Sequence, residues 1–233
     1  MSQQTSNSGL NDKQLVANHA ASLIEEGMIV GLGTGSTANY FIEQLARRKQ
    51  EENLAISVVA SSVVSTIKAQ QLGLNLIAIE HLKHLDIYVD GADEVSPDMT
   101  LLKGRGFDLV KEKLLARACD QFYVLIDNSK LVSRIGENFP IPMEVTPFAW
   151  QLVLQSVQNL GGEGGLRQNA AGDGLAISSH GNLILDIRFD SSMDSHRLNK
   201  ELNAVPCLIE HGIFEGLASQ ILLAEQGVVE IIC

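Results

Sequence analysis

Between residues 11 and 127, short apolar runs alternate with segments of helical periodicity, and this alternation limits the chain to few folds. The predicted strands are residues 28–32, 55–60, 74–79, 85–89 and 122–126. The predicted helices are residues 15–26, 37–47, 62–72 and 107–118. Continuous apolar strands separated by amphipathic helices are typical of a mostly parallel sheet with helices on both faces. The sequence therefore predicts a Rossmann-like α/β fold.

The pattern changes after residue 139, where glycine-punctuated segments replace the regular alternation. Two helices are predicted there, over residues 147–160 and 192–203, with strand signals between them at residues 166–168, 175–178 and 183–187. The tail returns to continuous apolar runs suited to the first sheet, at residues 220–224 and 227–232. We therefore expect a small α+β domain, residues 140–207, inserted into a large α/β domain made of residues 1–139 and 208–233.

The overall charge excludes two classes of partner. The chain carries a formal net charge of −11 at pH 7, with 45% hydrophobic and 19% charged residues. Such a composition is ordinary for a globular protein and argues against disorder. An acidic surface repels polyanions and anionic lipids, so we expect neither nucleic-acid nor membrane partners. A small anionic substrate remains compatible, because a pocket needs only a few local donors.

The cysteines and the N-terminus indicate the compartment. Cys119, Cys207 and Cys233 are odd in number and lack C-x-x-C spacing, which favours a reducing environment over disulfides or a zinc site. The first residues contain neither a basic region nor an apolar core, and no uninterrupted apolar run approaches ~18 residues. We expect a cytoplasmic protein without a signal peptide or membrane span.

A glycine-rich loop, Gly31-Leu-Gly-Thr-Gly-Ser-Thr37, follows one predicted strand and opens a helix. Free N–H groups and the helix dipole at such a place favour an anion, typically phosphate. The loop is neither a Walker A sequence nor a complete dinucleotide fingerprint, because Ser36 replaces the third glycine. Its hydroxyls suit a terminal monophosphate. The alternative is a plain strand-to-helix turn with Ser36 or Thr37 as the N-cap.

An acidic turn, Asp90-Gly-Ala-Asp-Glu94, comes directly after another predicted strand. Ligands of open parallel sheets bind at the carboxyl ends of the strands, which is where these acids fall. Carboxylates three residues apart can bind Mg²⁺, accept sugar hydroxyls or transfer protons. They can equally be solvated acids of an Asx-turn.

A lysine–glycine turn, Lys103-Gly-Arg-Gly106, leads into the predicted helix 107–118. It offers a cation and backbone N–H groups where negative charge develops. On that helix Glu112 has apolar neighbours at i±3 and i±4, which makes it a candidate base with a raised pKa. Because Lys111 and Lys113 flank it, Glu112 can also be an exposed surface residue.

The remaining candidates are isolated. Lys130 follows an apolar strand in Asp127-Asn-Ser-Lys130 and can reach a phosphate, although a lone turn lysine is usually only solvated. His81 and His84 have a metal-like spacing, but the sequence shows no third ligand nearby, so structural or surface roles are favoured.

Taken together in this order, these motifs resemble ribose-5-phosphate isomerases of the A type. The family's phosphate-side loop is matched by Thr34-Gly-Ser-Thr37, its acidic turn by Asp90-Gly-Ala-Asp93 and its lysine–glycine turn by Lys103-Gly-Arg-Gly106. Its catalytic glutamate falls on Glu112, and its later substrate-contacting lysine falls on Lys130. Two further stretches, Gly181–Asp186 and Leu202–Pro206, resemble the family's small domain, so the similarity covers nearly all of the chain beyond residue 10.

The resemblance implies an aldose–ketose isomerase that interconverts D-ribose 5-phosphate and D-ribulose 5-phosphate through an enediolate, in the non-oxidative pentose phosphate pathway. Glu112 is then the base, Lys103 and the N–H groups of residues 104–106 stabilise the enediolate oxygen, and Asp90 serves ring opening. The implied substrate-binding residues are Thr34, Gly35, Ser36, Thr37, Asp90, Gly91, Ala92, Asp93, Lys103, Gly104, Arg105, Gly106 and Lys130. The resemblance implies no cofactor and no metal, and it implies a homodimer or homotetramer.

Arg105 is a departure, because the family's turn normally has three glycines after its lysine. We expect an outward or benign arginine side chain, since Gly104 and Gly106 remain on both sides. Two competing functions are a non-catalytic sugar-phosphate sensor of the same fold and an acyl-CoA transferase of similar architecture. The acidic chain has no room for a DNA-binding domain, and a transferase would need a glutamate nucleophile in another loop.

Overall fold

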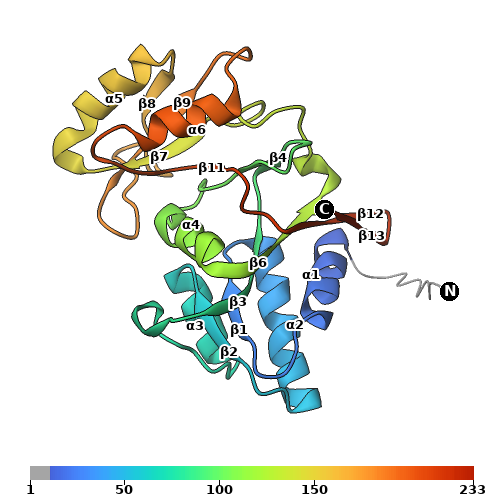
Figure 1. Cartoon of the computed structure of the whole chain (residues 1–233). Coiled ribbons are helices and arrows are strands. Elements are labelled where there is room, and N and C mark those ends of the chain that lie inside the picture. The colour runs from blue at the N-terminus through green and yellow to red at the C-terminus, as the bar shows by residue number, and fades with distance from the viewer. Residues whose placement is uncertain (1–10) are drawn as a thin grey trace. The chain divides into compact units, whose positions relative to one another are not determined.

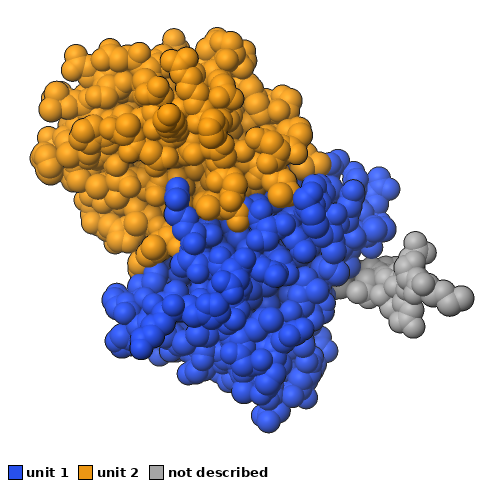
Figure 2. Space-filling model, viewed as in Figure 1, with its two compact units in different colours: residues 1–91, 115–130, 218–233 blue, residues 92–114, 131–217 orange. Residues whose placement is uncertain are grey.

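The computed structural model describes residues 11–233 and divides into two compact units (Figure 2). Residues 1–10, over which we expect no signal peptide, lie outside the described residues. Unit 1 comprises residues 1–91, 115–130 and 218–233, and unit 2 comprises residues 92–114 and 131–217. Three segments that the sequence assigns to the large domain, residues 92–114, 131–139 and 208–217, pack with unit 2. The strands of the first and last segments pair there, and backbone N–H groups of residues 131–139 donate to Glu94 and Val95.

Unit 1 is built on a six-stranded sheet in the order β13-β12-β6-β3-β1-β2 (Figure 1). Its strands are β1 (Ile29–Leu32), β2 (Ser57–Ala60), β3 (Leu85–Gly91), β6 (Cys119–Asp127), β12 (Gln220–Glu225) and β13 (Val228–Ile232). All neighbours pair in parallel except β12 and β13, which form an antiparallel hairpin. The expected mostly parallel α/β fold is therefore confirmed.

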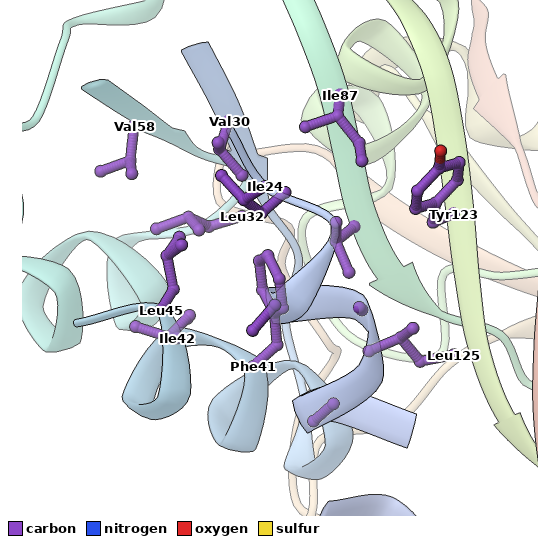
Figure 3. Packing of buried hydrophobic residues seen from close by; sticks show 14 of the residues in the cluster. Ile24, Val30, Leu32, Phe41, Ile42, Leu45, Val58, Ile87, Tyr123 and Leu125 are labelled. Carbon is purple, nitrogen blue, oxygen red and sulfur yellow. The ribbon is translucent and has the colours of Figure 1, made fainter. Parts of the chain in front are cut away.

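One face of this sheet is buried by the helices of the first half of the chain. These are α1 (Asp12–Ser22), α2 (Ser36–Glu52) and α3 (Val63–Gln71). Figure 3 shows Phe41, Ile42 and Leu45 of α2 packed near Val30 and Ile87 of the sheet. Since side chains alternate along a strand, the residues between these core positions face the other way. Tyr88 and Phe122 do so, and their rings stack with centroids 4.9 Å apart.

Helix α1 begins three residues earlier than the sequence pattern predicts. Asn11 accepts a hydrogen bond from the Gln14 backbone, and Gln14 returns one through its side chain, which completes a capping box. This cap places Lys13 in the first turn of the helix.

Unit 2 contains two small antiparallel sheets. The larger has the order β10-β7-β9-β8, from β7 (Ile141–Val145), β8 (Glu163–Leu166), β9 (Leu183–Arg188) and β10 (Leu208–His211). The smaller has the order β11-β5-β4, from β4 (Glu94–Val95), β5 (Leu101–Leu102) and β11 (Ile213–Phe214). Helices α4 (Leu109–Ala118), α5 (Trp150–Asn159) and α6 (Ser195–Asn203) complete the set, with α4 shared between the units. The expected α+β character of this part is confirmed.

Several predicted strands are wrong. Residues 74–79 form only a single bridge, Val58 to Leu76, before the 3₁₀ turn Ile79–His81. Of residues 166–168, Leu166 ends β8 and Gln168 makes an isolated bridge to Leu175, and in residues 175–178 Ile177 makes another to Leu183. The sheet instead uses β8, whose glycines carry no strand signal, and β7, which contains a proline; both are strands because their neighbours pair with them.

Candidate functional site

Three predicted site segments follow neighbouring parallel strands. The loop 33–37 follows β1, Asp90 and Gly91 end β3, and the 3₁₀ turn Asn128–Lys130 follows β6. Because β3 lies between β1 and β6, the carboxyl ends of these strands bring all three segments to one edge of the unit 1 sheet. Ligands of open α/β sheets bind at such an edge.

The glycine-rich loop enters α2 without a side-chain cap. Gly35 is the N-cap residue, at a φ of +117° that favours glycine, and its helix has no side-chain cap hydrogen bond. The alternative with Ser36 or Thr37 as N-cap is therefore wrong. Both residues stand in the first turn of α2, whose uncapped N–H groups and positive dipole end suit an anion.

Side chains that the sequence analysis missed support this loop. The Thr34 hydroxyl lies 3.1 Å from Ser61 Oγ and 3.3 Å from Ser65 Oγ, and the Ser65 hydroxyl donates to the Gly33 carbonyl. Ser61 directly follows β2, the neighbour of β1, so its position after an apolar strand was the available signal.

Lys13 is a second residue that the sequence analysis missed. Its ammonium donates to Ser36 Oγ at 3.0 Å, so a cation stands at the start of α2. Both residues line a cavity of about 710 Å³ in unit 1, together with Asn128 and Ser129 from the turn before Lys130. The capping box of α1 was the signal that could have placed Lys13 in an ordered helix.

Asp90 is fully buried and holds the two strand ends together. Its Oδ1 accepts from the N–H groups of Thr34 at 3.0 Å and Gly91 at 2.8 Å, and its Oδ2 accepts from the Tyr88 hydroxyl at 2.6 Å. Tyr88 and Asp90 meet because residues two apart on a strand share a face. A Cβ at Gly33 would lie 2.1 Å from Asp90 Oδ1, so glycine is required there.

The other predicted residues belong to unit 2, where Lys103 and Glu112 form a buried ion pair. The Lys103 ammonium lies 3.2 Å from Glu112 Oε2, and both side chains are over 90% buried. The ion pair and the burial hold the Glu112 carboxylate in one place on α4. The interpretation of Glu112 as an exposed surface residue is therefore wrong.

Helix α4 turns a second lysine inward. Lys113 is 1% exposed, and its ammonium donates to Glu210 Oε1 and to the His211 carbonyl, both at 2.5 Å. Because both partners lie on β10, they fix the turn of α4 that carries Glu112. The sequence pattern around Glu112 gave no sign of this burial.

The lysine–glycine turn accommodates an arginine at its middle position. Gly104 has a φ of +91°, whereas Arg105 keeps a negative φ. The Arg105 guanidinium lies 3.8 Å from the centre of the Phe139 ring, and the Arg105 N–H donates to Asp93 Oδ2 at 3.4 Å. The side chain is therefore held by a stacking contact within unit 2.

The buried side chain of Glu94 orders the segment that carries Phe139. Its carboxylate accepts backbone N–H groups of Gly136, Asn138 and Phe139 at 2.5–2.9 Å. A buried carboxylate needs such donors, and here they order the segment that carries the Phe139 ring. Glu94 is thus a structural member of the acidic turn.

The structure brings the predicted residues together in two groups. Unit 1 joins the 34–37 loop to Asp90 and places Lys130, half-buried, at the same sheet edge. Unit 2 joins Asp93, the 103–106 turn and Glu112. The chain passes from one group to the other between Gly91 and Ala92.

His84 has two carboxylate neighbours, whereas the sequence shows no third ligand near the His81–His84 pair. His84 lies 2.8 Å from Asp86 Oδ1 and 3.6 Å from Asp120 Oδ2, while His81 is not part of the group. Asp120 comes from the next strand of the sheet, which sequence spacing does not show. The hydrogen bond to Asp86 raises the pKa of His84.

None of the helices in residues 11–233 is long and apolar enough to span a bilayer. Unit 1 carries a phosphate-type loop and a buried aspartate at the carboxyl edge of its sheet, and unit 2 carries a buried lysine–glutamate pair beside a glycine turn. Such groups are typical of enzymes that act on small phosphorylated substrates. Comparison with known proteins specifies this class further.

The sequence profile of ribose 5-phosphate isomerase A (phosphoriboisomerase A) matches residues 57–227. Ribose-5-phosphate isomerase A of Thermosynechococcus vestitus is 41% identical over 214 residues, covering 91% of each chain. That of Thermococcus kodakarensis is 39% identical over 212 residues, 91% of this chain and 93% of its own. The chain belongs to the ribose-5-phosphate isomerase A family.

Solved structures agree with this assignment. Ribose 5-phosphate isomerase A of Methanocaldococcus jannaschii is 36% identical and superposes with a TM-score of 0.90, over 95% of this chain and 97% of that one. A D-ribose-5-phosphate isomerase in complex with phospho-erythronic acid is 33% identical with a TM-score of 0.91, over 96% and 99% of the two chains.

Proposed function

We propose that Glu112 is the base with which this enzyme interconverts ribose 5-phosphate and ribulose 5-phosphate in the pentose phosphate pathway. The observation that carries this proposal is the buried ion pair of Glu112 with Lys103 at 3.2 Å. A base fixed by a neighbouring cation is ordered before substrate arrives.

The isomerisation needs one base and one site for negative charge. Glu112 takes the proton from C2 of the open-chain aldose and returns it to C1, while the O2 proton passes to O1, so atoms and electrons balance within the sugar. Lys103 and the N–H groups of its turn stabilise the enediolate oxygen. Asp90, held by Thr34 and Tyr88, exchanges the proton needed for ring opening.

The phosphate is bound away from the reacting carbons. Thr34, Ser36 and Thr37 offer hydroxyl and N–H donors at the start of α2, and Lys130 and Lys13 add positive charge. Binding energy from this remote group positions the sugar carbons for proton transfer. Asp93 and the residues between it and Asp90 orient the hydroxyls.

The deciding experiment is a coupled isomerase assay on purified protein and its Glu112→Gln variant. The amide keeps the shape but removes the base, so kcat should fall at least ~10²-fold while ribose 5-phosphate still binds. Glu201→Gln, the same change at an exposed position on α6, is the matched control and should keep full activity. Normal turnover by Glu112→Gln would remove Glu112 from the mechanism.

The same assay separates the competing functions. A sugar-phosphate sensor would bind ribose 5-phosphate without turnover, and an acyl-CoA transferase would exchange CoA esters; family membership favours the isomerase over both. Activity that survives exhaustive chelation is expected if the acidic turn serves hydroxyls and protons. Loss restored by Mg²⁺ would instead make the turn a metal site.

Two further expectations stay predictions. A homodimer or homotetramer is tested by light scattering of the purified protein, and cytoplasmic location by cell fractionation.

A further inference from the structure

Arg167 lies at the start of the segment after β8 and is held rigidly by the larger sheet of unit 2. Its backbone N–H donates to the Ile184 carbonyl, and its carbonyl accepts from the Ala176 N–H. Its guanidinium docks on Asp186 of β9 through Nε at 2.8 Å and Nη2 at 2.6 Å. Such a two-point contact fixes the plane of the guanidinium.

The remaining guanidinium nitrogen reaches the lysine–glycine turn. Arg167 Nη1 donates to the Arg105 carbonyl at 3.0 Å and to the Gly106 carbonyl at 3.3 Å. The next carbonyl, that of Phe107, accepts from the Ser179 N–H at 3.0 Å. Three consecutive carbonyls between Lys103 and α4 are therefore held by side-chain or backbone donors of unit 2.

These bonds determine where the N–H groups of the turn point. In a trans peptide the N–H points opposite to the C=O of the same unit. With the Arg105 carbonyl bound to Arg167, the Gly106 N–H points away from Arg167. That N–H is one of the donors assigned to the enediolate oxygen.

We infer that Arg167, fixed by Asp186, is a positioning residue that aims the Gly106 N–H of the lysine–glycine turn at the charge that develops during isomerisation. The inference rests on the proposed role of this turn. An arginine is required, because a lysine ammonium on a flexible stem cannot dock on Asp186 at two points and still bridge two carbonyls. Hydrogen-bond donors that are oriented before the reaction stabilise mainly the transition state. Removing Arg167 should therefore lower kcat more than it raises KM.

The test uses Arg167→Ala, Arg167→Lys and Asp186→Asn in the full-length protein. We expect kcat to fall about 10- to 100-fold in Arg167→Ala, with KM for ribose 5-phosphate changed less than about threefold. Arg167→Lys should fail to rescue it, Asp186→Asn should show part of the loss, and added guanidinium should restore part of the Arg167→Ala activity. Arg188→Ala is the matched control, because Arg188 lies on β9, the strand of Asp186, and like Arg167 donates to a loop carbonyl, that of Asn138.

Binding of phospho-erythronic acid separates positioning from folding and from the proposed base. Its carboxylate carries negative charge as the enediolate does, so Arg167→Ala should bind it at least about tenfold more weakly, at unchanged affinity for inorganic phosphate. Glu112→Gln should lose turnover yet keep phospho-erythronic acid binding. If Arg167→Ala keeps kcat and this affinity while Glu112→Gln is inactive, the positioning role is refuted and the base stands. Equal losses of kcat in Arg167→Ala and Arg188→Ala would also refute the positioning role, because they would indicate a general loss of stability in unit 2.

Discussion

Replacing Gly33 by alanine tests whether the buried Asp90 carboxylate needs its exact place. A Cβ at residue 33 would lie 2.1 Å from Asp90 Oδ1 and 2.5 Å from Asp90 Cβ, so Asp90 or the loop must move. Asp90 is bound by the N–H groups of Thr34 and Gly91 and by the Tyr88 hydroxyl. Any movement that relieves the clash weakens at least one of these bonds.

The size of the effect follows from those contacts. Overpacking costs about 1–3 kcal/mol, and a hydrogen bond to a charged group contributes about 1.5–3 kcal/mol. We expect Gly33→Ala to lower the free energy of unfolding by about 2–4 kcal/mol. Misplacing a group that transfers protons should also lower kcat by at least ~10²-fold, about 2.7 kcal/mol in activation free energy.

Urea unfolding and the coupled isomerase assay measure the two effects, and a double-mutant cycle assigns them. In an Asp90→Gly background all three clashing atoms of residue 90 are gone, so Gly33→Ala should cost far less stability there. Gly91→Ala is the control for the unfolding measurement, because its Cβ would meet only the Leu125 carbonyl at 3.6 Å. Near-normal stability and turnover of Gly33→Ala, or additive costs in the cycle, would refute the reasoning.

Three other predictions follow from the same contacts. Arg105→Gly removes the stacking on Phe139 and should lower the free energy of unfolding by about 0.5–1 kcal/mol. It should change kcat/KM less than ~10-fold, or about 1.4 kcal/mol in activation free energy. If only the variant is active, the wild-type arginine blocks the site. Lys130→Ala should raise the KM for ribose 5-phosphate about tenfold or more. Unphosphorylated ribose, which we expect to be a poor substrate, should be turned over as by the wild type. An equal loss on both sugars would show that Lys130 does not bind the phosphate. The hydrogen bond to Asp86 raises the pKa of His84 above its ordinary 6.5, so the stabilisation is complete below pH 6.5 and disappears as pH rises through the folded-state pKa. The Tm difference between wild type and His84→Gln should therefore be present at pH 5.5 and absent at pH 9, and a pH-independent difference would contradict it.

The sequence alone determined the parallel sheet and the order of the segments at its carboxyl edge. Apolar strands and amphipathic helices of the first half are local patterns, and they predict a fold in which loops after strands meet at one edge. Thr34, Asp90 and Lys130 could be placed there for that reason. Motif order and spacing also predicted the family, which the comparisons confirm.

Only the tertiary structure decided how polar residues are buried and which small strands form. Glu112 has lysines on both sides in the sequence, yet it is buried with Lys103, nine residues away, as its ion-pair partner. Its neighbour Lys113 is buried because β10 supplies partners about 100 residues away. The proline-containing β7 is a strand because β9 and β10 pair with it on both edges. The Arg105 side chain is held by Phe139, and the Arg105 carbonyl by Arg167. Local sequence propensity does not predict such contacts. The free energy of burying a charge or pairing a strand depends on groups that only the folded chain brings together.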